Sequence, residues 1–178
     1  MHIFSDLYYI LKGRFFKFES KEYSLGFIGH ARWHKDRYRK YAFFKFFPKS
    51  LVIFFMNNFW PITLSKVTGV YSLKDKKEVH GYVLGITATS DYLVKNRKQA
   101  LRKIRNTLYL ARGKGAKIVG LGGLTSSLSG GGTMLLDIDI NITTGHAYTA
   151  YNVTQNFFKL VEIRKLSKEQ IKIAVVGA

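Results

Sequence analysis

The sequence predicts an α/β fold in which a mixed, mostly parallel sheet is flanked by helices. Short apolar runs typical of buried strands occur at Tyr23–Ile28, Lys117–Gly120 and Ile171–Val176. Segments with apolar residues at helical spacing separate these runs, and such alternation favours a parallel sheet with crossover helices. The 178 residues are 47% hydrophobic, which is enough for one domain with a core.

The N-terminal part of the chain is rich in aromatic residues. Met1–Phe18 is weakly amphipathic and predicts a short helix that lies either on the domain or on a membrane surface. Trp33–Phe47 has apolar residues at four-residue steps and predicts a helix that ends before Pro48. The apolar segment Ser50–Phe59 predicts a buried helix, with Ser50 as its cap.

The middle of the chain predicts two strands and a long helix. Ile62–Tyr71 and Val79–Thr87 are expected to pair as a hairpin, because the polar link between them is short. Asp91–Gly113 is the clearest helix of the chain, and either Gly113 or Gly115 supplies its C-cap.

The C-terminal third predicts one further strand and helix. Apolar and polar residues alternate over Met134–Ile142, which favours a strand. The next helix is expected over Ala147–Ile163, with Tyr148, Val153 and Phe157 facing inward.

Composition narrows the classes of function. The net charge of +18 favours encounter with nucleic acid, anionic lipid or an acidic carrier protein. Because the chain has no cysteine, disulfides, thiolate metal sites and a cysteine nucleophile are excluded within it, which fits a cytoplasmic location. The longest uncharged run, Ser50–Ser65, is too short to span a bilayer, and Met1–Phe18 lacks the pattern of a signal peptide.

Glycines and hydroxyls gather directly after the predicted strand Lys117–Gly120. Glycine lets the backbone approach a bound group closely, and the carboxyl ends of strands form the usual ligand edge of an open α/β sheet. We therefore expect Gly122, Gly123, Thr125 and Ser126 to bind substrate, the alternative being glycines that only form turns. The loop matches neither a P-loop nor a dinucleotide fingerprint, because the spacing of both motifs fails.

Other candidate ligand residues precede a helix and end a strand. Thr143, Thr144 and His146 lie at the start of the expected last helix, where backbone amides and the helix dipole favour an anionic or oxygen-rich ligand. His30 ends the first predicted strand and is also assigned to the substrate site. No grouping of His, Asp or Glu has metal-ligand spacing, so we predict no metal site.

Cations cluster on the long helix. Lys98, Arg102 and Arg105 share one helical face, and no acidic residue occurs between Asp91 and Asp137. The face is either simply solvated or a docking patch for an acidic protein or a phosphate-bearing carrier.

The end of the chain resembles the start of a dinucleotide-binding βαβ unit. Ile171–Ala178 is an apolar strand that ends in Gly177-Ala178, and the remaining glycines and the crossover helix of such a unit are missing. The sequence therefore predicts an extension at residues 1–22, a substrate domain at 23–169 and the start of a truncated cofactor domain at 170–178. It also predicts that the chain is the N-terminal part of a longer enzyme.

A series of motifs occurs in a fairly specific order and spacing: Gly26-Phe27-Ile28-Gly29-His30, Lys66-Val67-Thr68-Gly69, His80-Gly81-Tyr82-Val83-Leu84-Gly85, Gly115 to Ser126, Thr143-Thr144-Gly145-His146-Ala147-Tyr148-Thr149 and Val175-Val176-Gly177-Ala178. With these motifs, the chain from about Ser24 to Ala178 resembles the N-terminal region of the fatty-aldehyde-generating long-chain acyl-[acyl-carrier-protein] reductases. It is more similar still to their bacterial relatives, the predicted amino-acid or shikimate-type dehydrogenases.

The resemblance implies an α/β substrate domain that is followed, in a longer protein, by an NADPH-binding Rossmann domain. In the acyl reductases a cysteine beyond this region attacks the acyl thioester, and hydride from NADPH releases the aldehyde. The implied partners are an acidic acyl carrier protein or acyl-CoA. Gly177 and Ala178 would begin the cofactor loop, and the present chain alone would neither bind NADPH nor catalyse the reaction.

An alternative from another class is a stand-alone basic module that binds nucleic acid or an anionic membrane. No specific nucleic-acid motif accompanies the charge.

Overall fold

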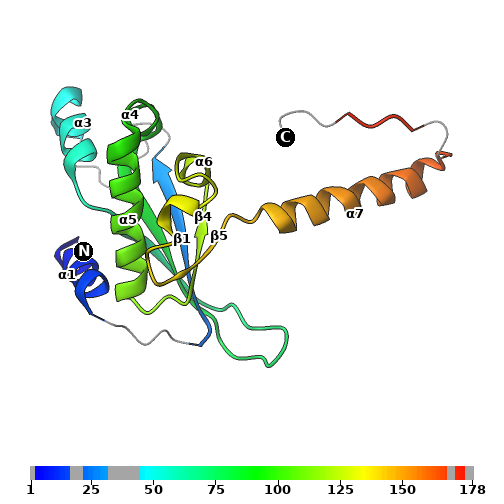
Figure 1. The fold of residues 1–178 in the computed structure, drawn as a ribbon, viewed down its shortest axis with the longest axis horizontal. Helices are drawn as coiled ribbons and strands as arrows, with labels where there is room; N and C mark the ends of the chain where they lie inside the picture. Colours follow the sequence, from blue (N-terminus) through cyan, green and yellow to red (C-terminus); the bar gives the residue numbers. More distant parts are fainter. Residues whose placement is uncertain (1–2, 17–21, 32–44, 168–170, 175–178) are drawn as a thin grey trace. The chain divides into compact units, whose positions relative to one another are not determined.

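The structure is a computed structural model that describes residues 3–16, 22–31, 45–167 and 171–174, and it confirms the predicted α/β fold class (Figure 1). Five strands form one sheet in the order β2-β3-β1-β4-β5. They are β1 Ser24–Ala31, β2 Ile62–Val67, β3 His80–Thr89, β4 Ile118–Leu121 and β5 Asn141–Thr143. All neighbours pair in parallel except β2 and β3, which form the predicted antiparallel hairpin.

The chain divides into two compact units, Met1–Thr144 and Gly145–Ala178. The first unit holds the whole sheet, and the second holds α7 (His146–Arg164). The division therefore falls after β5 and not at the predicted residue 169. The helix found within the expected extension, Ile3–Phe15, packs on the rest of the first unit.

The core lies between the sheet and α5 (Arg97–Gly113). Ile104 and Leu108 of this helix are fully buried in one cluster with Ile28 and Leu84 of the two adjacent parallel strands β1 and β3. α5 also forms the crossover that carries the chain from β3, on one side of β1, to β4 on the other side.

The long helix predicted over residues 91–113 is interrupted. α4 spans Ser90–Lys95, and α5 begins at Arg97. Between them Asn96 leaves the helical region, and its backbone and side-chain amides both donate to the Tyr92 carbonyl oxygen at 3.0 Å. A short polar side chain that bonds to nearby backbone competes with helix continuation. The C-cap of α5 is Lys114, and the predicted Gly115 follows it with φ +86°, the position at which a glycine commonly ends a helix.

Two further predictions of local structure were wrong. α3 (Lys49–Asn58) begins after Pro48, so Ser50 lies inside the helix, and only Val52 and Met56 are buried. The helix meets the domain with one face only, and residues four apart share that face.

The strand predicted over residues 134–142 shrinks to β5. The 3₁₀ helix η2 (Thr133–Leu135) and a turn precede it, in which the Ile138 amide donates to Leu135 and the Ile140 amide to Ile138. These local hydrogen bonds satisfy backbone N–H and C=O groups that would otherwise pair with a neighbouring strand. The alternation of apolar and polar residues over 134–142 arises because Leu135 and Ile138 are buried while their neighbours are exposed.

The second unit contains α7, and no side chain of that helix is buried. Tyr148 and Val153, which were expected to face inward, are exposed on this helix, and Phe157 is half-buried. Ile171–Ala174 belong to no strand, so the predicted final strand is not formed over these residues. Its remainder, including the predicted cofactor residues Gly177 and Ala178, lies outside the described residues, as does most of the helix predicted over 33–47.

The N-terminal helix α1 (Ile3–Phe15) packs directly on α5. Both helices carry a Tyr-x-x-x-Gly sequence at the crossing, Tyr9 to Gly13 and Tyr109 to Gly113. A Cβ on Gly13 would lie 1.9 Å from the Tyr109 carbonyl oxygen, and a Cβ on Gly113 would lie 2.0 Å from that of Tyr9. The two backbones therefore touch, which only glycine permits at these positions.

A buried ion pair also holds α1 in place. Asp6 is 2% exposed and accepts hydrogen bonds from the Thr63 backbone amide and hydroxyl, both at 2.7 Å. The Lys114 ammonium lies 3.0 Å from the same carboxylate and 4.3 Å from the centroid of the Tyr9 ring. These contacts tie α1 to β2 and to the end of α5.

We expect Gly13→Ala to destabilise the protein by about 1–3 kcal/mol, because the new methyl group would push the two helices apart. In a helix without such a neighbour the same change stabilises by about 1 kcal/mol, so the sign of the effect is diagnostic. Urea unfolding followed by circular dichroism measures it. Gly29→Ala in strand β1 is the control for an added methyl group without a clash, since a Cβ there has no atom within 4 Å. Equal effects of the two substitutions would contradict the close crossing.

Candidate functional site

The candidate site lies where the carboxyl ends of β1 and β4 meet. The two strands are parallel neighbours, with Ile28 opposite Leu121. After β1 the chain continues to β2 and β3 on one side of it, and after β4 it continues to β5 on the other side. Connections that leave in opposite directions create a topological switch point, the usual ligand position of an open α/β sheet.

His30 and the turn at Gly122–Leu124 contact each other at this point. The Nε2 atom of His30 accepts a hydrogen bond from the Leu124 backbone amide at 3.3 Å, and Nδ1 lies 3.3 Å from the Ala31 carbonyl oxygen. Since Nε2 must present a lone pair, these partners assign the tautomer with its proton on Nδ1. The imidazole is half-buried, so part of it faces solvent.

Glycine is required at two positions of the turn. Gly123 has φ +56° and ψ −134°, and a Cβ there would lie 3.0 Å from His30 Nε2. At Gly122 a Cβ would lie 2.7 Å from the Ile28 carbonyl oxygen, to which the Gly122 amide donates at 2.9 Å. The structure therefore brings together three of the predicted substrate residues, His30, Gly122 and Gly123.

The hydroxyls that follow support the loop. Thr125, in the short helix α6 (Leu124–Leu128), is fully buried and donates to the Gly122 carbonyl oxygen at 2.8 Å. Ser126 is 5% exposed, and the buried Ser129 hydroxyl donates to Thr125 at 2.7 Å. Thr125 and Ser126, which were predicted to contact substrate, are therefore buried within the loop.

A second glycine cluster, Gly130–Gly132, closes the turn after α6. All three residues have positive φ, and the Gly131 amide donates to the Ser126 carbonyl oxygen at 2.8 Å. Residues in this conformation commonly end a helix by bonding to its last carbonyls. These glycines form a turn, which was the alternative left open by the sequence.

The remaining predicted substrate residues lie further along the chain. Thr143 ends β5 opposite Gly120 of β4, so it lies at the same edge of the sheet as His30, and its side chain is exposed. Thr144 follows half-buried. His146 is exposed and begins α7. Because α7 belongs to the second unit, His146 is not part of the site described in the first unit.

The predicted docking face retains two of its three cations. Lys98 and Arg102 are exposed, but Arg105 donates to both carboxylate oxygens of Asp137, at 2.5 and 2.7 Å, and to the Met134 carbonyl oxygen at 3.0 Å. Hydrogen bonding to Asp137 raises the pKa of Arg105, and the same contact holds the pKa of Asp137 below its ordinary value of 3.8. Sequence reasoning missed this partner because Asp137 reaches the helix only through the fold.

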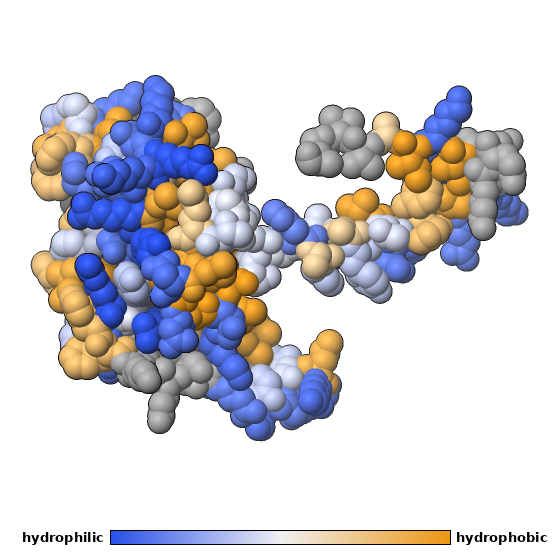
Figure 2. All heavy atoms as spheres, viewed as in Figure 1, coloured by the Kyte–Doolittle hydropathy of each residue, from blue (hydrophilic) through white to orange (hydrophobic). Residues whose placement is uncertain are grey.

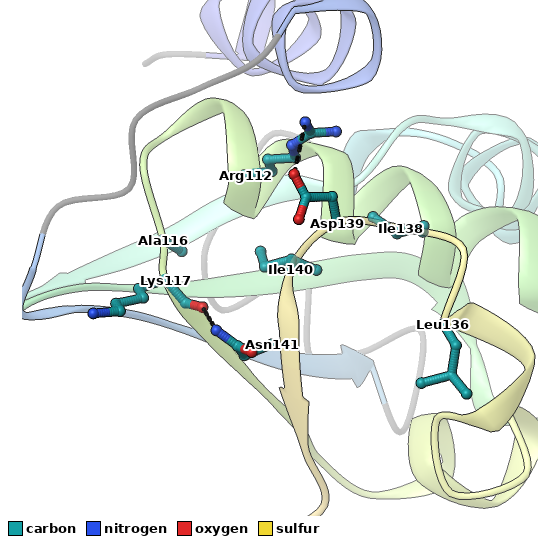
Figure 3. A pocket seen from close by; sticks show the side chains of 8 residues that line it. All are labelled: Arg112, Ala116, Lys117, Leu136, Ile138, Asp139, Ile140 and Asn141. Carbon is teal, nitrogen blue, oxygen red and sulfur yellow. Dashed lines mark hydrogen bonds and ion pairs between the residues drawn. The ribbon is translucent and has the colours of Figure 1, made fainter.

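A hollow that the sequence did not signal lies at the opposite, amino end of the strands. A pocket of about 350 Å³ is lined by Arg112, Lys117 and the segment that leads into β5 (Figure 3). Arg112 pairs with Asp139 at 3.5 Å, and the Asn141 amide donates to the Lys117 carbonyl oxygen at 3.0 Å. Because these polar groups bond to one another, we assign the pocket no ligand.

No protein-family model matches the chain, and no curated protein matches it either. Within the described ranges, no three His, Asp or Glu side chains are placed to hold a metal ion. Among the helices of the same ranges, none has the length and apolarity needed to cross a bilayer.

We expect the stabilising effect of Asp137 to depend on pH. Its pKa is lowered in the folded protein, so the ion pair contributes stability above pH 3.8, and the contribution is lost as pH falls through the lowered pKa. The melting temperature of Asp137→Asn should therefore lie below that of the wild type at neutral pH, and the gap should close in acid. Melting curves followed by circular dichroism over this pH range check it. A gap that does not change with pH would contradict the ion pair.

Proposed function

We propose that this chain is the substrate-binding part of an NAD(P)H-dependent reductase that converts an acyl thioester to an aldehyde. The observation that carries the proposal is the contact of His30 with the Gly122–Leu124 turn at the switch point of the sheet. The resemblance to the acyl-carrier-protein reductases supplies the class of substrate.

The switch point offers groups suited to a thioester. The His30 imidazole is a hydrogen-bonding group at the edge of the sheet, and the exposed Gly123 lets the backbone approach a bound carbonyl closely. Because the buried Thr125 hydroxyl holds the turn, the turn is already ordered before a ligand binds. A preformed polar site of this kind costs little to organise on binding.

The cofactor would supply the hydride in the complete reaction. The residues predicted to begin its loop, Gly177 and Ala178, lie outside the described residues. The proposal therefore rests on the groups that would contact the thioester, His30 and the Gly122–Leu124 turn.

Binding of octanoyl-CoA to the full 178-residue chain, followed by NMR, tests the proposal. We expect the amide signals of Gly122, Gly123 and Leu124 to shift, and His30→Ala to weaken the affinity about three- to tenfold, as the loss of one hydrogen bond would. Leu73→Ser is the control: it replaces a 90% exposed side chain in the link between β2 and β3 and should leave the affinity unchanged. Shifts confined to the pocket at Arg112 and Asn141, or no saturable binding, would refute the proposal.

The exposed cations of α5 predict how an acyl carrier protein would associate. Lys98→Glu with Arg102→Glu should slow association by about tenfold at low salt and by less at high salt, because electrostatic attraction guides the encounter. The same charge change at Lys74 and Lys76 in the β2–β3 link is the matched control. Stopped-flow binding of an octanoyl carrier protein measures both. If the two double variants slow association equally, the net charge of the chain alone accounts for the effect, and α5 is not the docking face.

A further inference from the structure

One face of α1 exposes a continuous stripe of large apolar side chains. Phe4, Tyr8, Leu11 and Phe15 follow each other at spacings of four, three and four residues, and they are 82%, 59%, 48% and 69% exposed. Such spacing places them on one side of a helix. The contacts with α5 are made by the opposite side, which carries the buried Asp6, Ile10 and Gly13.

The apolar surface continues from α1 to α3. The ring of Phe4 lies 6.4 Å from that of Trp60, which stacks on Phe59 at 4.1 Å directly after α3. On α3 itself Phe54 and Phe55 are 61% and 49% exposed. Figure 2 shows hydrophobic surface, in orange, along the edge of the molecule where these two helices lie. We call this surface the aromatic face.

The charges around the aromatic face are of one sign. Lys12 and Arg14 flank the stripe, with Lys12 Nζ 5.9 Å from the Tyr8 ring and Arg14 Cζ 5.4 Å from the Phe15 ring. Lys45 precedes α3 and Lys49 begins it, and both are exposed. Among residues 3–16 and 45–61 the sole acidic residue is Asp6, which is buried and paired with Lys114.

We propose that the aromatic face docks on the surface of an anionic lipid bilayer. Aromatic rings favour the boundary between headgroups and acyl chains, and neighbouring lysines and arginines are attracted to acidic headgroups. A second copy of the chain is a poorer occupant, because each copy carries a net charge of +18 and would bring further cations against those that flank the face. The inference stands on this surface alone and does not depend on the proposed reductase function.

Flotation of the full chain with vesicles tests the proposal. We expect binding to vesicles that contain phosphatidylglycerol, weaker binding to phosphatidylcholine alone, and loss of affinity as salt is raised. The triple variant Phe4→Ser, Tyr8→Ser and Phe15→Ser should lose at least about tenfold in affinity, because it removes three apolar anchors. All three side chains are more than half exposed, and far-UV circular dichroism and melting curves verify that the variant folds.

Matched controls separate this face from general attraction to charge. Leu73→Ser removes a still more exposed apolar side chain elsewhere and should change the affinity less than about twofold. Lys12→Gln with Arg14→Gln should weaken binding more than Lys74→Gln with Lys76→Gln. The proposal is overturned if the wild type does not float, if the triple variant binds as the wild type does, or if the two double variants weaken binding equally. A dimer in sedimentation velocity that the triple variant abolishes, without any vesicle binding, would assign the face to a second copy and overturn it too.

Discussion

The pairing of β1 on both sides is the constraint on which the rest of the fold depends. Parallel partners on either side require crossover connections, and α5 makes the one that carries the chain over β1 to β4. This crossover buries the helix against the sheet. The chain leaves β1 toward β2 and β3 and leaves β4 toward β5, so these two connections run in opposite directions. The carboxyl ends of those two strands therefore meet, and His30 comes to lie beside Gly123 although 93 residues separate them in the chain.

The outer layer depends on a second close approach. Without side chains at Gly13 and Gly113, α1 lies directly on α5, and the buried Asp6 adds an ion pair to Lys114. This contact uses one side of α1 and leaves the aromatic stripe on the other side facing solvent. The sequence left two placements open for this helix, on the domain or on a membrane. The structure shows the first, and the exposed stripe is the reason that we also propose the second.

Part of the candidate site could be predicted from residue type and position along a strand. His30, Gly122 and Thr143 each lie at the carboxyl end of a strand, and such ends gather at one edge of a parallel sheet. The burial of Thr125 could not be predicted, because it depends on how α6 folds back onto the sheet. The pairing of Arg105, one of the three cations of the predicted docking face, had the same origin, since its partner Asp137 is 32 residues away.

The sequence by itself determined the fold class, the hairpin of β2 and β3, the long helix α5 and the glycine-rich turn after β4, because hydrophobic period and turn chemistry are local properties. Only the tertiary structure decided that 134–142 forms turns before a short strand, that α1 packs on α5, and which polar side chains remain accessible. These outcomes depend on hydrogen-bond partners and packing surfaces that come from distant parts of the chain, and no local pattern encodes the position of such a partner.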